Sequence, residues 1–256
     1  MLASAVAQKK NVEGMRAVER VAQRLNDLPQ GVTVGLWDLG VRAGSLPEVV
    51  AKLNAGQDAF TFFEVQAAIP AGLVSRQPRL ADWVSEHSAG GARKKDLEQV
   101  QSNVIDDDFF KYARTIRRDL GLGYLAGITP HLIAGIEDDE PFWNRFASSS
   151  GRNGKGRLLL ISAYHLREDA KKANRPFEVS VAALVVAQLL IAVSSQLGYH
   201  EDVDDCLFNS VARRETAVEA IKKLDLEPEC LNRVSQRYRG ATTTLMGALR
   251  AYEARG

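Results

Sequence analysis

The sequence has few of the features that identify a function at sight. Among its 256 residues there are two cysteines, Cys206 and Cys230, and four histidines, and the formal net charge is +1. Two cysteines are too few for a disulfide scaffold and are typical of a protein of the reducing cytoplasm. A near-zero net charge gives no long-range attraction to nucleic acid or to anionic membranes.

Long apolar segments are also missing. The first 29 residues contain no apolar core of the kind that signal peptides carry. The longest apolar run, Val179 to Val193, is interrupted by Ser180 and Gln188 and is shorter than the roughly 18–20 residues that span a bilayer. We therefore expect a cytoplasmic protein without a membrane segment, in which this run is a buried core helix.

Strand and helix patterns alternate over the first two thirds of the chain and helices follow, which predicts a mixed α/β (α+β) fold. Strands are expected over residues 31–40, 59–70, 123–136 and 156–167, with a long loop over 137–155. Helices are expected over residues 11–27, 45–54, 80–86, 96–120, 179–198, 210–224 and 228–254, the second opened by a capping box at Ser45 and Glu48. The domain boundaries predicted are a helix over 1–28 and one domain over 29–256.

Three segments in the second half carry a resemblance to a known family. They are GYLAGITPHLIA, FWNRFASSSGRNGKGRLLLISAYHLR, and LLIAVSSQLGYHEDVDDCLFN followed by LEPEC. In order and spacing they resemble the archaemetzincin family of zinc metallopeptidases, whose helix HExxHxxGxxHC is followed by CxMN and CxxC. The resemblance implies a metzincin-like mixed sheet with a buried former active-site helix, flanked by extra N- and C-terminal helices.

The residues that would hold catalytic zinc are mostly replaced. With His200 as the third ligand, Leu190 and Ser194 stand at the two helical histidines and Ile191 stands at the general base. One imidazole cannot hold a catalytic zinc ion, and isoleucine cannot accept a proton from water. By this mechanism the chain has no catalytic residues.

The family's second, cysteine-based zinc site is also altered. Cys206 and Cys230 match two of its four ligands, and Glu201 and Glu227 occupy the other two places. The simpler interpretation is a solvated acidic turn after the helix, with Cys206 packed as a small apolar side chain. We expect no metal and no other cofactor, and keep His200, Glu201, Cys206 and Cys230 as weak metal candidates, with zinc as the ion.

Other polar patterns are less specific. The loop SSSGRNGKGR carries Arg152, Lys155 and Arg157, which could hold an anion or an acidic partner segment, but it leads into a strand and so is not a phosphate-binding P-loop. None of the four histidines has another four residues away on the same helix face. The mildly basic C-terminal residues lack interleaved aromatics, so nucleic-acid binding is not expected.

Three functions compete. The first is a non-catalytic pseudo-metallopeptidase that binds a protein or peptide, for example by strand addition at an edge within residues 156–167 or 123–136. The second is a metal-dependent hydrolase whose site has moved to the neighbourhood of His200, with His165, Glu201, Asp204 or Cys206. The third is a structural subunit of a homo-oligomer or a larger complex, assembled through the terminal helices.

Overall fold

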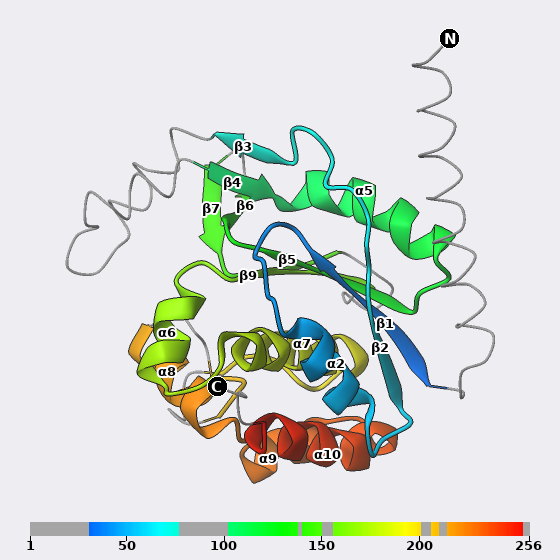
Figure 1. The fold of residues 1–256 in the computed structure, drawn as a ribbon, viewed down its shortest axis with the longest axis vertical. Coiled ribbons are helices and arrows are strands. Elements are labelled where there is room, and N and C mark those ends of the chain that lie inside the picture. Colours follow the sequence, from blue (N-terminus) through cyan, green and yellow to red (C-terminus); the bar gives the residue numbers. More distant parts are fainter. Residues whose placement is uncertain are drawn as a thin grey trace.

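The computed structural model describes residues 31–76, 102–137, 140–149, 156–200, 206–209 and 214–252. The helix expected at the N-terminus, the short helix over residues 80–86, and Arg152, Lys155 and Glu201 all lie outside these ranges. The chain forms two mixed β-sheets with helices around them, which confirms the α/β class (Figure 1).

The larger sheet has five strands in the order β2-β1-β5-β9-β8. Its strands are β1 (Val32–Asp38), β2 (Phe60–Glu64), β5 (Tyr124–Thr129), β9 (Leu158–Ser162) and β8 (Phe146–Ser148). The first four are parallel, and β8 pairs antiparallel with β9. All five residues of β9 are buried, as expected for a parallel strand that is covered on both faces.

The smaller sheet has four strands in the order β3-β4-β6-β7. They are β3 (Val74–Arg76), β4 (Ser102–Ile105), β6 (Leu132–Glu137) and β7 (Glu140–Asn144). Together with α5 (Asp106–Asp119) this sheet covers one face of the larger one (Figure 1). At the contact the ring of Phe109 lies so close to Gly127 that a Cβ there would meet it at 2.4 Å, so the site requires glycine.

Helices cover the other face of the larger sheet. They are α2 (Leu46–Asn54), α6 (Leu166–Lys172), α7 (Phe177–Val193), α8 (Arg214–Lys223), α9 (Pro228–Arg233) and α10 (Arg239–Arg250), with a 3₁₀ turn at Gln236–Tyr238. Every residue of α7 from Val179 to Leu190 is buried, which confirms the expected core helix. A helix that is apolar on all sides is stable only where other elements surround it.

The structure corrects several boundaries. The segment 123–136 is two strands in different sheets, divided at Pro130, and the loop expected after it contains β7 and β8. Residues 102–105 are a strand rather than the start of a helix, because the β-branched Val104 and Ile105 pair with β6. Residues 166 and 167 begin helix α6 rather than ending a strand. Ser45 lies at the N-cap of α2 without forming a side-chain capping hydrogen bond.

The strands expected to offer a free edge are interior. β9 lies between β5 and β8, β5 lies between β1 and β9, and β6 lies between β4 and β7. Leu160, at the centre of β9, is completely buried. Strand addition at these strands is therefore wrong as a binding mode, because their backbone hydrogen bonds are already made.

No single helix in the described part of the chain is long and apolar enough to cross a membrane. By length and composition α6 and α7 would suffice together, but they are bent by 109° at the break between them.

Candidate metal centre

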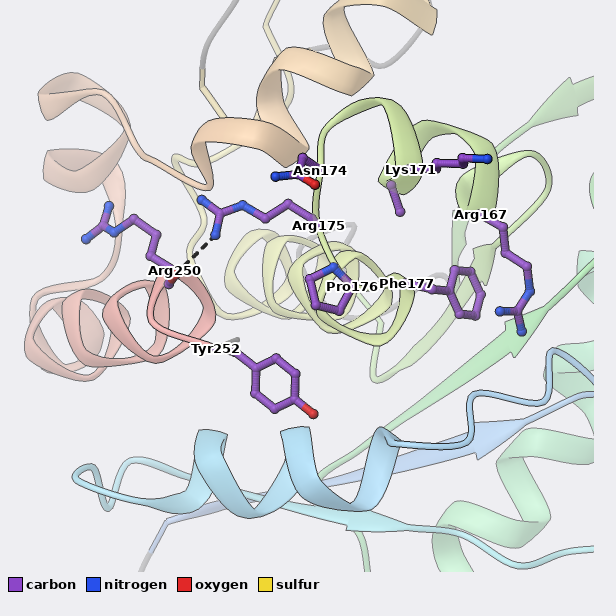
Figure 2. A pocket seen from close by; sticks show the side chains of 9 residues that line it. Arg167, Lys171, Asn174, Arg175, Pro176, Phe177, Arg250 and Tyr252 are labelled. Atoms are coloured by element: carbon purple, nitrogen blue, oxygen red, sulfur yellow. Dashed lines mark hydrogen bonds between the residues drawn. The ribbon is translucent and has the colours of Figure 1, made fainter. Parts of the chain in front are cut away.

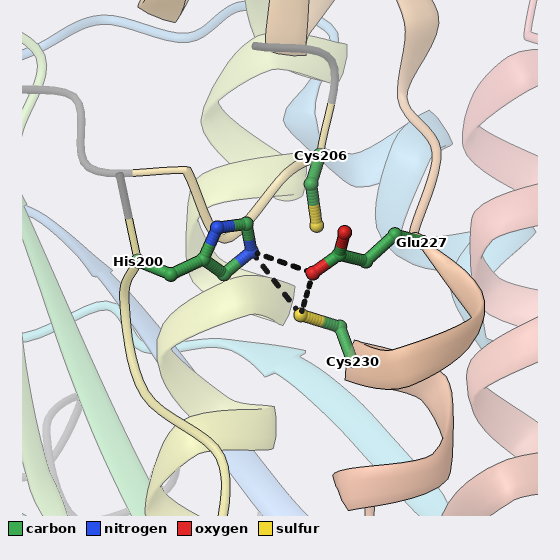
Figure 3. A group of neighbouring side chains, drawn as sticks. All are labelled: His200, Cys206, Glu227 and Cys230. Atoms are coloured by element: carbon green, nitrogen blue, oxygen red, sulfur yellow. Dashed lines mark hydrogen bonds and ion pairs between the residues drawn. The ribbon is translucent and has the colours of Figure 1, made fainter. Parts of the chain in front are cut away.

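Four side chains that can bind metal converge beside the start of α9 (Figure 3). They belong to His200, Cys206, Glu227 and Cys230, and one ligand atom from each lies within 4.8 Å of all the others. This is the one group of three or more such side chains that the described residues form. Three of the four weak candidates from the sequence, His200, Cys206 and Cys230, are brought together here.

The spacing of the donor atoms fits tetrahedral coordination. Nε2 of His200, Oε1 of Glu227 and Sγ of Cys230 are 3.2 Å from one another in all three pairs. Ligand bonds to zinc of roughly 2.0–2.3 Å give tetrahedron edges of about 3.3–3.8 Å. Two thiols, an imidazole and a carboxylate are also donors that zinc accepts. The residues present therefore fit a zinc ion.

Local backbone pairing holds the donors in place. The N–H of His200 donates to the carbonyl of Phe208, and the N–H of Leu207 donates to the carbonyl of Asp225. These bonds hold the segment that carries Cys206 against both His200 and the chain that leads into α9. Pro228 then begins α9, whose first turn brings Glu227 and Cys230, three residues apart, to the same side.

The cluster is mostly shielded from solvent. The cysteines are 2% and 1% exposed, and the side chains of His200 and Glu227 are 11% and 23% exposed. Burial, with the neighbouring Glu227 and Cys206, raises the pKa of the Cys230 thiol. Without a cation the thiol is therefore neutral and donates to the Glu227 carboxylate. Nδ1 of His200 is buried without a hydrogen-bond partner among the described residues.

The C-terminal end of α7, with Leu190 and the following Ser194, is packing surface. Leu190 and the Ser194 side chain, both fully buried, lie at or just beyond the end of α7, and Ile191 is half-buried. Oγ of Ser194 accepts a hydrogen bond from the N–H of Ser235, 3.1 Å away, and Oγ of Ser235 donates to the Val193 carbonyl. These contacts join the end of α7 to the segment after α9.

The remaining candidates from the sequence that the structure describes do not converge. Arg157 is exposed just before β9. His131 follows β5, and burial lowers the pKa of its imidazole. His165 precedes α6 with φ of 58° and faces Glu168 at 3.7 Å.

Glu227, in contrast, stood out in the sequence only as a replaced cysteine, and the E-x-x-C spacing is the signal that could have assigned it to the site.

A cavity of about 670 Å³ lies elsewhere, where the turn between α6 and α7 faces α10 (Figure 2). Among the described residues its lining includes the cations Arg167, Lys171, Arg175 and Arg250 and no acidic side chain. Arg175 donates to the carbonyls of Lys222 and Arg250. Arg167 donates to the carbonyl of Val41 and lies over the ring of Phe177 at 3.7 Å. Both guanidinium groups thus join elements through neutral carbonyl acceptors.

Two solved structures are similar to the chain. One is archaemetzincin from Archaeoglobus fulgidus complexed with malonate, at 13% identity and a TM-score of 0.44. The other is a zinc-dependent peptidase from Methanocorpusculum labreanum, at 11% identity and a TM-score of 0.45. Each similarity covers 79% of this chain and 100% of the other. No protein-family model and no curated protein sequence matches the chain.

Proposed function

We propose that this chain is a non-catalytic, cytoplasmic binding protein, a pseudo-metallopeptidase whose C-terminal helices are held by one structural zinc ion. The observation that carries the proposal is the composition of the α7 face. Leu190 and Ile191 offer no donor for a metal and no base for water, and the Ser194 hydroxyl is engaged with Ser235.

The cluster at His200 supports a structural role for zinc rather than a catalytic one. Catalytic zinc sites keep a coordination position open for water, whereas structural sites fill all four positions with protein ligands. His200, Cys206, Glu227 and Cys230 supply four donors within 4.8 Å of one another. A hydrolase relocated to this cluster would have no position for its water.

When bound, zinc supplies positive charge that stabilises both thiolates and links the segments that carry the ligands. The chain's own part is to present four donors from three segments. His200 follows α7, Cys206 lies in the paired segment beside Asp225, and Glu227 and Cys230 begin α9. The ion would join the end of the core helix to the C-terminal helices.

For the partner, we infer an acidic segment of another protein at the cavity of Figure 2. Charge complementarity supports this, because the lining residues that the structure describes include four cations and no carboxylate. Arg250 is already paired with Asp225, 2.7 Å away. Lys171, in contrast, is exposed and its charge is available to a partner.

The test is elemental analysis of the full chain purified without chelator, together with a peptidase assay of the same zinc-loaded sample. We expect one zinc ion per chain, a near-ultraviolet thiolate charge-transfer band with visible ligand-field bands on replacement by cobalt, and no hydrolysis of an unstructured protein substrate. Hydrolysis that disappears in His200→Ala would overturn the non-catalytic assignment. Absence of bound metal at saturating zinc would overturn the structural site.

A further inference from the structure

The two sulfur atoms of the cluster belong to the only cysteines in the chain. Cys206 and Cys230 lie within 4.8 Å of each other through their ligand atoms, and both side chains are buried. They come from segments that are 24 residues apart in sequence and are paired in space through the bridge between Cys206 and Asp225. A pair of neighbouring thiols can release a metal by forming a covalent bond instead.

We propose that Cys206 and Cys230 form a disulfide when the protein meets hydrogen peroxide, and that this reaction empties the metal site. The inference rests on the proposed function for the metal, and it adds a regulation that the structural role does not require. The metal-bound dithiolate and the disulfide exclude each other, because both use the same two sulfur atoms.

The reaction is balanced by the peroxide. One thiolate attacks a peroxide oxygen, the O–O bond breaks, and the departing hydroxide is protonated to water, which leaves a sulfenic acid on that cysteine. The second thiolate attacks the sulfenic sulfur, the S–S bond forms, and a second hydroxide leaves and is protonated. Two electrons pass from the sulfur atoms to the peroxide, two protons are consumed, and two water molecules are formed.

The two cysteines come from segments that backbone pairing holds side by side. A disulfide needs its sulfur atoms about 2.05 Å apart and its Cβ atoms about 3.5–4.5 Å apart. The bond from Leu207 N–H to the Asp225 carbonyl keeps the backbone beside Cys206 close to the start of α9. Glu227, the most exposed of the four ligands that the structure places here, lies where peroxide would enter.

After loss of the ion, the other two ligands, His200 and Glu227, can still pair with each other. His200 and Glu227 are already 3.2 Å apart and form an ion pair when the imidazole is protonated. The disulfide would take over the link between the paired segment and α9, while the link from the end of α7 through His200 would lose its metal bond. Oxidation should therefore loosen the contact of His200 without unfolding the domain.

The experiment uses the full chain loaded with zinc and treated with increasing hydrogen peroxide. Three quantities are followed: zinc released to a colorimetric chelator, free thiols after denaturation, and the intact mass. We expect one zinc ion to be released for each pair of thiols lost, with a mass decrease of two hydrogen atoms. A thiol reductant with fresh zinc should restore the starting state. Loss of thiols without release of zinc, or oxidation to sulfinic acid without a disulfide, would overturn the proposal.

Two controls separate this inference from the metal assignment. In Cys206→Ser, peroxide should not produce the loss of two hydrogen atoms, because Cys230 has no partner within the chain. Should the purified protein take up no zinc, the metal assignment fails before any peroxide is added. The mass change of that metal-free sample then tests whether peroxide forms the disulfide. A disulfide between Cys206 and Cys230 supports that part of the proposal, and persistent free thiols overturn it.

Discussion

The hydroxyl of Ser194 accepts a hydrogen bond from the backbone N–H of Ser235, 3.1 Å away, at the C-terminal end of the core helix. In return, the hydroxyl of Ser235 donates to the carbonyl of Val193. The reciprocal pair satisfies groups that the end of α7 would otherwise leave without partners. Ser194 thus serves as part of a helix cap.

Replacing Ser194 by alanine should lower the free energy of unfolding. The substitution leaves the Ser235 N–H without its acceptor beside a buried position, and such a loss costs roughly 1–2 kcal/mol. Urea denaturation followed by circular dichroism measures the change. The matched control is Ser195→Ala, because Ser195 is the next residue and is exposed. Equal stability of the two variants would show that the cap contributes nothing.

Zinc content should not change in Ser194→Ala. Its hydroxyl is committed to the cap, and the four donors of the cluster lie on other residues. Elemental analysis of the same preparations tests this independently of stability. A variant that loses its metal would place Ser194 in the coordination shell and contradict the separation of the two features.

The fold was predictable where the pattern was local. A β-branched pattern predicts β1, a helix-start pattern predicts α2, and a long apolar run predicts the buried α7. The structure confirms all three. The break at Pro130 was visible in the sequence. That β5 and β6 enter different sheets was not visible, because their pairing depends on strands distant in sequence. The C-terminal segment reads as one helix, yet Val234 and Ser235 leave the helical conformation to meet the end of α7.

The candidate site was predictable in its parts and not in its geometry. His200, Cys206 and Cys230 were recognisable as donors, but only the tertiary structure shows that they meet Glu227 instead of the solvent. The decisive contacts are backbone bonds between segments, such as Leu207 to Asp225, which leave no periodic signal in the sequence. The expectation that no metal binds remains an untested prediction. The four donors fit a zinc ion, and the proposed function therefore departs from that expectation.

Replacing Glu227 by glutamine should weaken zinc binding. The amide keeps the size of the side chain but removes the negative charge that would bind the ion, and we expect a loss of affinity of at least about tenfold. Competition with a chelator of known affinity measures it. The control is Glu229→Gln in the same helix, whose carboxylate is exposed and paired with Arg233. Equal affinity in both variants would exclude Glu227 as a ligand.

Side-chain amides occupy the outer edge of β2. Asn54 donates to the carbonyl of Phe62 and accepts from its N–H, and Gln57 makes the same pair of contacts with Phe60. Each amide takes the place of a neighbouring strand. Because an unpaired edge is a template for association, these side chains keep β2 from pairing with other chains.

Replacing Asn54 and Gln57 together by alanine should therefore promote self-association. The change frees the N–H and C=O groups of Phe60 and Phe62, and it should also lower stability by a few kcal/mol. Sedimentation velocity over a range of concentrations detects the association. Lys52→Ala, at an exposed position of the same helix, should remain at the oligomeric state of the wild type. A double variant that sediments like the wild type would mean that the edge is protected by something other than the amides.

The cationic cavity gives the most direct test of partner chemistry. A peptide of six glutamates should bind the full chain, and Lys171→Glu should weaken that binding, because the substitution reverses an exposed charge at the lining. Fluorescence anisotropy of the labelled peptide, with a glutamine peptide as the reference, gives the affinities.

Lys111→Glu is the control, since Lys111 lies on α5, across the larger sheet from the cavity. Raising the salt concentration should reduce the affinity of the wild type, because screening weakens exposed charge pairs. Equal loss in both variants would assign the binding to the overall charge of the chain and remove the cavity as the partner surface.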